Sequence, residues 1–315
     1  MTRNVLSYES TGSDPVVVTD RLTKRYGERT VVDAVSLTVR RGEVYGFLGP
    51  NGAGKTTTLR LLLGLVRHTS GRASVLGQSP GSPRALTGVG ALVEGPGFFP
   101  YLSGRDNLRV LARYRGLTDV AVGAALEQVD LAGRGGDRYK SYSLGMKQRL
   151  GVAAALLGGP HLLILDEPTN GLDPAGMADM RQLIRALADQ GHTVLLSSHL
   201  LGEVQQLCDR VGVISAGRLV AEGTVADLLG SASLLVRAEP LPTATRVAAA
   251  LVGDERVSQV DRALLVRAEV EQAAELNRAL VEAGVAVREL RPQVRTLEDA
   301  FFAVTGTALD PEEER

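Results

Sequence analysis

One eight-residue run constrains the fold of this chain more than any other feature: Gly49, Pro50, Asn51, Gly52, Ala53, Gly54, Lys55 and Thr56. It matches the pattern G-x-x-x-x-G-K-[S/T] at every position. The apolar stretch Val44–Leu48 precedes the run and a helical pattern follows from Thr57, so the run joins a strand to a helix. Glycines let backbone N–H groups converge on a phosphate chain at a helix N-terminus. The run therefore predicts a phosphate loop and a nucleotide site.

Two side chains of this loop carry specific chemistry. Lys55 can reach the β- and γ-phosphates of a nucleoside triphosphate, and the Thr56 hydroxyl can bind Mg²⁺. Only four of the 35 basic residues are lysines, so a lysine at this defined position is informative. The alternative, a glycine-rich turn with no ligand, is disfavoured because the match and its strand-to-helix setting agree.

A pair of acids ends another apolar strand, at Asp166 and Glu167. Open α/β sheets place their ligands at the carboxyl ends of their strands. Asp166 is suited to hold Mg²⁺, and Glu167 is suited to act as the general base for a water that attacks the γ-phosphate. The alternative is an acidic pair that merely precedes Pro168. That alternative is disfavoured in a chain that also contains a phosphate loop.

The length and composition limit the class of protein. A chain of 315 residues suggests about two domains of ~100–200 residues each. Its net charge of −1 argues against a nucleic-acid partner, and its single cysteine, Cys208, fits a reducing compartment. No apolar run approaches the ~18–20 residues of a membrane span, and the N-terminus has no signal-peptide pattern. We expect a cytoplasmic protein.

Strand and helix patterns alternate over some 200 residues, which predicts an α/β fold with a mostly parallel sheet. We assign residues 1–14 to a flexible tail and residues 15–230 to this domain, with a helical insert at about 80–141. The expected strands are Val35–Val39, Val44–Leu48, Val89–Val93, Leu162–Leu165 and Val194–Ser197. The expected helices are Lys55–Val66, Arg105–Tyr114, Val120–Val129, Met146–Leu157 and Ala175–Asp189.

The pattern changes after residue 230. Residues 231–306 predict a small accessory domain of order βαββαβ, which is the ferredoxin-like α+β arrangement. A last helix is expected at Thr296–Thr305, and residues 307–315 form an acidic tail. This domain contains no cluster of reactive side chains, so its role is not predicted.

Five motifs in one order carry a family resemblance. The phosphate loop is followed by Ser143-Leu-Gly145, the Asp166-Glu167 strand, a run from Asn170 to Pro174, and Ser197-Ser-His199. Over roughly residues 16–226 the chain resembles the P-loop ATPase subunits of ATP-binding cassette (ABC) transporters. The form Tyr-Ser-Leu-Gly-Met-Lys-Gln-Arg-Leu resembles the drug and peptide-antibiotic resistance exporters among them.

The resemblance implies a role for each matching residue. Tyr26 should stack on the adenine of ATP, and His199 should hydrogen-bond the γ-phosphate and orient the attacking water. Ser143 and Gly145 should contact the ATP held by a second ATPase subunit. Asp173 should lie at the seam between the two subunits. Lys55, Glu167 and His199 are then the catalytic residues, and Thr57 joins the phosphate loop in binding ATP.

Two positions depart from the family pattern. The signature usually has two glycines after its serine, and here Leu144 takes the place of the first. The loop after Val89–Val93 should offer a glutamine to Mg²⁺, and here Glu94 stands in that place. Glu94 can still ligate Mg²⁺, but a negative charge near the γ-phosphate is unfavourable unless something offsets it. We expect a slower basal rate or altered coupling.

The resemblance implies the ATP-hydrolysing motor of a membrane exporter. Two copies would dock beneath a separate integral-membrane permease, on the inner face of the cell membrane. The aromatic residues Phe98, Phe99, Tyr101 and Tyr114 of the insert would form the docking surface or pack locally. The alternatives are a non-transport ATPase that acts on ribosomes or DNA, and a transporter of another cargo, such as lipid or polysaccharide. A transporter subunit that acts as a sensor or an importer is a third alternative.

Overall fold

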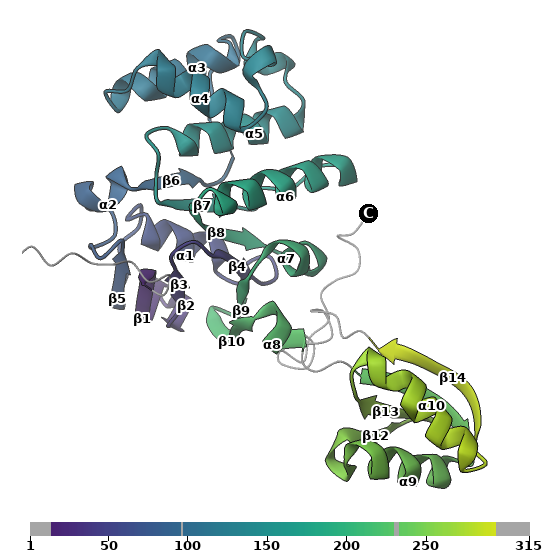
Figure 1. The fold of residues 1–315 in the computed structure, drawn as a ribbon. Coiled ribbons are helices and arrows are strands. Elements are labelled where there is room, and N and C mark those ends of the chain that lie inside the picture. Colours follow the sequence, from purple (N-terminus) through teal and green to yellow (C-terminus); the bar gives the residue numbers. More distant parts are fainter. Residues whose placement is uncertain (1–13, 96, 230–232, 294–315) are drawn as a thin grey trace, which may run out of the picture. The chain divides into compact units, whose positions relative to one another are not determined.

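The computed structural model describes residues 14–95, 97–229 and 233–293 (Figure 1). The chain divides into two compact units, one that contains the residues up to Gly223 and one that begins at Thr224. The expected helix Thr296–Thr305, the acidic tail and all but the last residue of the N-terminal tail lie outside the described residues. In the described part of the chain, no helix is long and apolar enough to cross a membrane.

A six-stranded sheet forms the centre of the first unit, in the order β10-β9-β4-β8-β7-β6. The strands from β9 to β6 pair in parallel. Every residue of β4, β7 and β8 is buried, because helices cover both faces of a parallel sheet. Four of the expected strands are confirmed here. The bounds are β4 Val44–Leu48, β6 Val89–Leu92, β7 Leu162–Asp166, β8 Thr193–Ser198, β9 Arg210–Ser215 and β10 Arg218–Thr224.

A second, antiparallel sheet contains β1 (Pro15–Tyr26), β2 (Arg29–Val35), β3 (Thr38–Arg40) and β5 (Ser70–Val75). The expectation of one strand at Val35–Val39 is wrong, because β2 ends and β3 begins inside that range. The Thr19 hydroxyl donates to the Val35 carbonyl oxygen (3.0 Å) and accepts the Leu37 N–H (2.9 Å), so one side chain of β1 bridges the break between β2 and β3. The sequence analysis did not predict β1 or β5.

The helices of the first unit fall into two groups. Those around the sheet are α1 (Lys55–Leu62), α2 (Pro83–Thr87), α6 (Pro174–Asp189) and α7 (Leu201–Leu207). The helix α1 ends four residues before the expected Val66, because Gly64 has φ +71° and the Arg60 carbonyl accepts the N–H groups of Leu65 and Val66.

The other group comprises α3 (Gly104–Tyr114), α4 (Asp119–Gln128) and α5 (Leu144–Leu156), which pack on one another at the top of Figure 1. Ser103 caps α3 through the Asp106 N–H (3.0 Å). Within the range 80–141, α2 and the strand β6 precede this group of helices, and β6 belongs to the central sheet.

The second unit contains one antiparallel sheet and two longer helices. Its strands lie in the order β12-β13-β11-β14, and the helices α9 and α10 pack against them. Leu234, Val236, Leu264, Leu276 and Leu280 are fully buried in its core. The elements are α8 Val225–Leu229, β11 Ser233–Glu239, α9 Leu241–Val252, β12 Val257–Val260, β13 Ala263–Arg267, α10 Ala273–Glu282 and β14 Ala286–Gln293. From β11 onward, this is the predicted βαββαβ order.

Candidate functional site

The phosphate loop lies between β4 and α1, as its sequence context predicts. Gly54 has φ +108°, and a Cβ atom there would lie 2.7 Å from the Val31 carbonyl oxygen. A Cβ atom at Gly49 would lie 2.3 Å from the Ile214 carbonyl oxygen. Only glycine fits these two positions, because β2 and β9 press against the loop. The loop therefore has one defined shape at the N-terminus of α1.

Lys55 begins α1, and its side chain is only 6% exposed. Its ammonium donates to the Gly49 carbonyl oxygen (2.6 Å) and lies 3.3 Å from the Pro50 carbonyl oxygen. It also lies 3.1 Å from Glu167 Oε1. The structure thus brings together the phosphate-loop lysine and the acid that ends another strand.

The ends of β7 and β8 form a hydrogen-bonded chain around Ser197. The Ser197 hydroxyl donates to Asp166 Oδ1 (2.5 Å) and accepts the Glu167 N–H (3.0 Å). Ser197 is fully buried and pairs with Asp166 in the parallel register of β7 and β8. The sequence analysis gave no role to Ser197. Hydroxyl side chains at the carboxyl end of a fully buried strand are the signal that could have revealed it.

Glu167 makes a second contact, a hydrogen bond between its Oε2 and His199 Nδ1 (2.8 Å). Which ring nitrogen of His199 carries a proton depends on its tautomer. Burial by itself raises the pKa of Glu167, but the hydrogen bond with His199 and the Lys55 ammonium outweigh it. The pKa of Glu167 therefore lies below its usual value, and the carboxylate is ionised at neutral pH.

Thr56 and Asp166 offer oxygen donors that suit Mg²⁺. Their hydroxyl and carboxylate, together with phosphate oxygens and water, form the hard-oxygen set that Mg²⁺ prefers. Asp166 uses one oxygen for Ser197, which leaves its other oxygen for a metal. The described residues contain no group of three or more His, Cys, Asp or Glu side chains that could hold a metal on their own. The residues present thus fit Mg²⁺ that arrives with a nucleotide.

Ser143, Gly145 and Asp173 come together at a separate place, where α5 and α6 begin. Ser143 caps α5 through the Met146 N–H (3.2 Å), and Asp173 caps α6 through the Gly176 N–H (3.1 Å). These residues line a cavity of about 720 Å³ that no phosphate-loop residue lines. The caps give both side chains a local structural role in addition to any role in binding.

Leu144 and Gly171 adjoin each other in that cavity. Leu144 is 48% exposed, and its Cδ2 lies 3.1 Å from where a Cβ atom of Gly171 would stand. Gly171 has φ +76°, so a side chain at that position is disfavoured on both counts. The leucine that replaces the usual glycine is thus accommodated against a residue without a side chain.

Tyr26 and Glu94 occupy exposed positions. Tyr26 ends β1 and is 48% exposed, and the Lys24 ammonium lies 4.6 Å from the centre of its ring. Glu94 follows β6 with φ +60°, its side chain is 61% exposed, and its carboxylate forms an ion pair with Arg60 of α1. The sequence analysis did not predict this partner.

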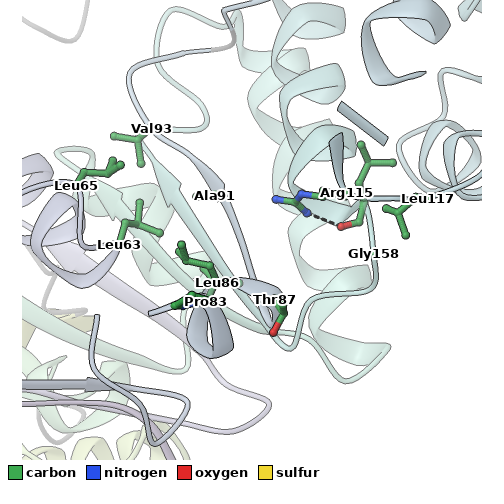
Figure 2. Close-up of a pocket in the computed structure, with 12 residues that line it drawn as sticks. Leu63, Leu65, Pro83, Leu86, Thr87, Ala91, Val93, Arg115, Leu117 and Gly158 are labelled. Carbon is green, nitrogen blue, oxygen red and sulfur yellow. Dashed lines mark hydrogen bonds between the residues drawn. The ribbon is translucent and has the colours of Figure 1, made fainter. Parts of the chain in front are cut away.

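An apolar groove of about 700 Å³ adjoins the end of α1 (Figure 2). Its lining comes from the segment after α1, from α2, from β6 and from the segments that follow α3 and α5. Arg115 donates to the Leu157 carbonyl oxygen (2.6 Å) at one side of it. The apolar lining residues are Leu63, Leu65, Pro83, Leu86, Val89, Ala91, Val93, Leu117 and Leu157.

Residues 32–170 match a family model described as ABC transporter. The uncharacterised ABC transporter ATP-binding protein YdbJ of Bacillus subtilis is 39% identical, over 93% of this chain and 96% of that protein. The bacitracin transport ATP-binding protein BcrA of Bacillus licheniformis is 40% identical, over 92% and 97%. The daunorubicin resistance ATP-binding protein DrrA3 of Streptomyces coeruleorubidus is 37% identical, over 93% and 97%.

Solved structures of ABC transporter subunits also match about two thirds of this chain. CbiO1 of Clostridium perfringens, part of the ABC transporter complex CbiONQ, superposes with a TM-score of 0.63 and 25% identity, over 68% of this chain and 90% of that chain. An ATP-binding subunit of another ABC transporter superposes with a TM-score of 0.61 and 29% identity, over 68% and 91%.

Proposed function

Because this chain belongs to the ABC transporter family, as an ATP-binding subunit whose ATP hydrolysis is coupled to transport, we propose that it drives a drug or peptide-antibiotic exporter. The observation that carries this proposal is the contact of Lys55, Glu167 and His199 beside the phosphate loop. The cargo class rests on relatives named for bacitracin transport and daunorubicin resistance.

The proposed chemistry divides the site among five side chains. Lys55 binds the β- and γ-phosphates of ATP within the backbone N–H groups of the loop. Thr56 and Asp166 hold Mg²⁺, which neutralises phosphate charge when bound. Glu167 accepts the proton of the attacking water, and its lowered pKa keeps it ionised for that task. His199 orients the Glu167 carboxylate and contacts the γ-phosphate.

We propose that the active unit contains two ATPase subunits, most simply two copies of this chain. Ser143 and Asp173 line a cavity apart from the phosphate loop. Two half-sites of this kind suit a nucleotide held between one copy's phosphate loop and its partner's Ser143 and Gly145. Tyr26 would stack on adenine with the ring face that Lys24 does not cover.

The partner in the membrane is proposed to be a separate permease, which would keep this chain on the inner face of the cell membrane. The groove of Figure 2 suits an apolar segment of that permease, because nine of its twelve lining residues are apolar side chains. The aromatic residues of the insert support docking only in part. Phe98 packs edge-on against Tyr139 (5.3 Å between ring centres), whereas Tyr101 and Tyr114 are exposed.

The second unit is proposed to be a ferredoxin-like accessory domain that spans residues 231–306. Its support is the βαββαβ order together with the strand order β12-β13-β11-β14, in which β11 and β13 are central.

The test is a purification of the full-length tagged protein from detergent-solubilised native membranes, with ATPase assays on the product. We expect a hydrophobic multi-span permease to co-purify, and Mg²⁺-dependent ATP hydrolysis. Recovery with ribosomes or DNA would overturn the exporter assignment and favour a non-transport ATPase. A permease that moves lipid or polysaccharide would overturn the cargo class alone.

A further inference from the structure

Glu94 and Glu167 occupy equivalent positions at one edge of the central sheet. Leu92 of β6 pairs with Leu165 of β7 in parallel register, and each glutamate follows two residues later. Both have left-handed backbone, with φ +60° at Glu94 and φ +48° at Glu167. Carboxyl ends of parallel strands meet at the same edge, so both carboxylates stand where the sheet receives its ligand.

Each of these carboxylates contacts a cation of the same helix. Lys55 at the first residue of α1 contacts Glu167, and Arg60 near its end forms the ion pair with Glu94. The two residues are five positions apart on α1, so their Cα atoms are separated by about 7.5 Å along the helix axis. The helix that begins at the phosphate loop therefore supplies one positive charge for each of these two glutamates.

Arg60 is fixed by the helix that carries it. The neighbouring Leu59 and Leu61 are buried in the core, while the Arg60 side chain is 31% exposed. Its carbonyl accepts the N–H groups of Leu65 and Val66, which close the end of the helix. A basic side chain in the last turn is also favoured by the helix dipole. The helix therefore fixes the backbone position from which the Arg60 side chain reaches Glu94.

We propose that Arg60 is a positioning residue for the ATPase reaction. It neutralises Glu94, so that this carboxylate does not repel the phosphates of ATP. The proposal rests on the function proposed above. Glu94 adds a negative charge to an edge that already holds Asp166 and Glu167. Without Arg60, a nucleotide with several negative charges would meet three carboxylates there and only one of the two α1 cations.

The experiment measures binding of MgATP and KM and kcat for hydrolysis, with the full-length protein. The variants are Arg60→Ala, Arg60→Lys, Glu94→Gln and the double variant Arg60→Ala/Glu94→Gln. We expect Arg60→Ala to raise the Kd for MgATP about threefold to tenfold, because Glu94 then repels the nearby phosphates with one uncompensated charge across water. The double variant and Arg60→Lys should both return the Kd to within about twofold of wild type.

The rescue separates charge compensation from simple support of the fold. A structural role would leave the double variant as impaired as Arg60→Ala, and that result would overturn the proposal. An unchanged Kd in Arg60→Ala would overturn it too. Arg109→Ala is the matched control, since Arg109 pairs with Asp106 and Asp119 on the helical insert and should leave the Kd unchanged. Failure of wild type itself to bind ATP would instead refute the proposed function.

Discussion

The ends of β6 and β7 have the same arrangement of charged residues, but their side chains differ in burial. Each strand is followed by a glutamate in left-handed backbone, and each glutamate contacts a cation of α1. The side chains of Lys55 and Glu167 are 6% and 18% exposed, whereas those of Arg60 and Glu94 are 31% and 61% exposed. Burial strengthens a charge interaction and solvent weakens it. The β7 end can therefore support chemistry that the β6 end can only modulate.

The largest expected difference concerns turnover. Glu167→Gln should lower kcat by about 10²–10⁴, because a positioned base contributes that much, and MgATP should still bind. Single-turnover hydrolysis with radiolabelled ATP and an equilibrium binding assay measure the two quantities. Turnover near the wild-type rate would remove Glu167 from the role of general base.

The next difference concerns stability. Lys55→Met should lower the free energy of unfolding by about 2–4 kcal/mol, because it leaves a buried carboxylate with one charged partner fewer. Arg60→Met should change it by less than about 1 kcal/mol, because its ion pair is largely exposed. Urea denaturation at pH 7 compares the two variants. Equal losses would show that burial does not make the ion pair at the β7 end stronger than the one at the β6 end.

Lowering the pH should remove the stabilisation that ionised Glu167 provides at the end of β7. The pKa of Glu167 is lower in the folded protein than its ordinary value of 4.5, so its ionised form stabilises the fold. That contribution is present above about pH 4.5 and is lost as the pH falls through the folded-state pKa. It amounts to about 1.4 kcal/mol for each unit of depression. The stability difference between wild type and Glu167→Gln should therefore shrink from pH 7 to pH 3.5. A difference that stays constant over this range would show that ionised Glu167 is not stabilising.

The smallest effect is expected at the β6 end. Glu94→Gln should change the basal ATPase rate by about threefold or less and shift its Mg²⁺ dependence, since an exposed ion pair contributes only ~0–1 kcal/mol. Rates measured across a Mg²⁺ titration test this expectation. If both the rate and the Mg²⁺ dependence match wild type, Glu94 has no part in the reaction.

The sequence predicted the parts of the site that local patterns encode. Four strands of the central sheet read as continuous apolar runs, and the phosphate loop and Asp166-Glu167 stand at strand ends. The contact of Lys55 with Glu167 then follows from topology. The ion pair of Arg60 with Glu94 joins residues 34 positions apart, and no local pattern signals it.

The sheet of β1, β2, β3 and β5 shows the other limit. Strands β1 and β5 contain many polar residues, and their pairing, for example Val17 with Val75, joins distant parts of the chain. The small unit was easier to predict from Leu234 onward, because its strands and helices alternate over short distances. Its order followed from periodicity, whereas no residue pattern indicates its task.

Backbone groups of neighbouring segments hold the phosphate loop in one shape. The carbonyl groups of Ile214 and Val31 pack closely against Gly49 and Gly54. The Ala53 carbonyl accepts the Gly217 N–H (3.0 Å). The loop is thus ordered when the chain folds. Nucleotide binding therefore costs little further conformational entropy in the loop. Substitutions in β2 or after β9 that loosen these contacts should weaken nucleotide affinity from positions that never touch the nucleotide.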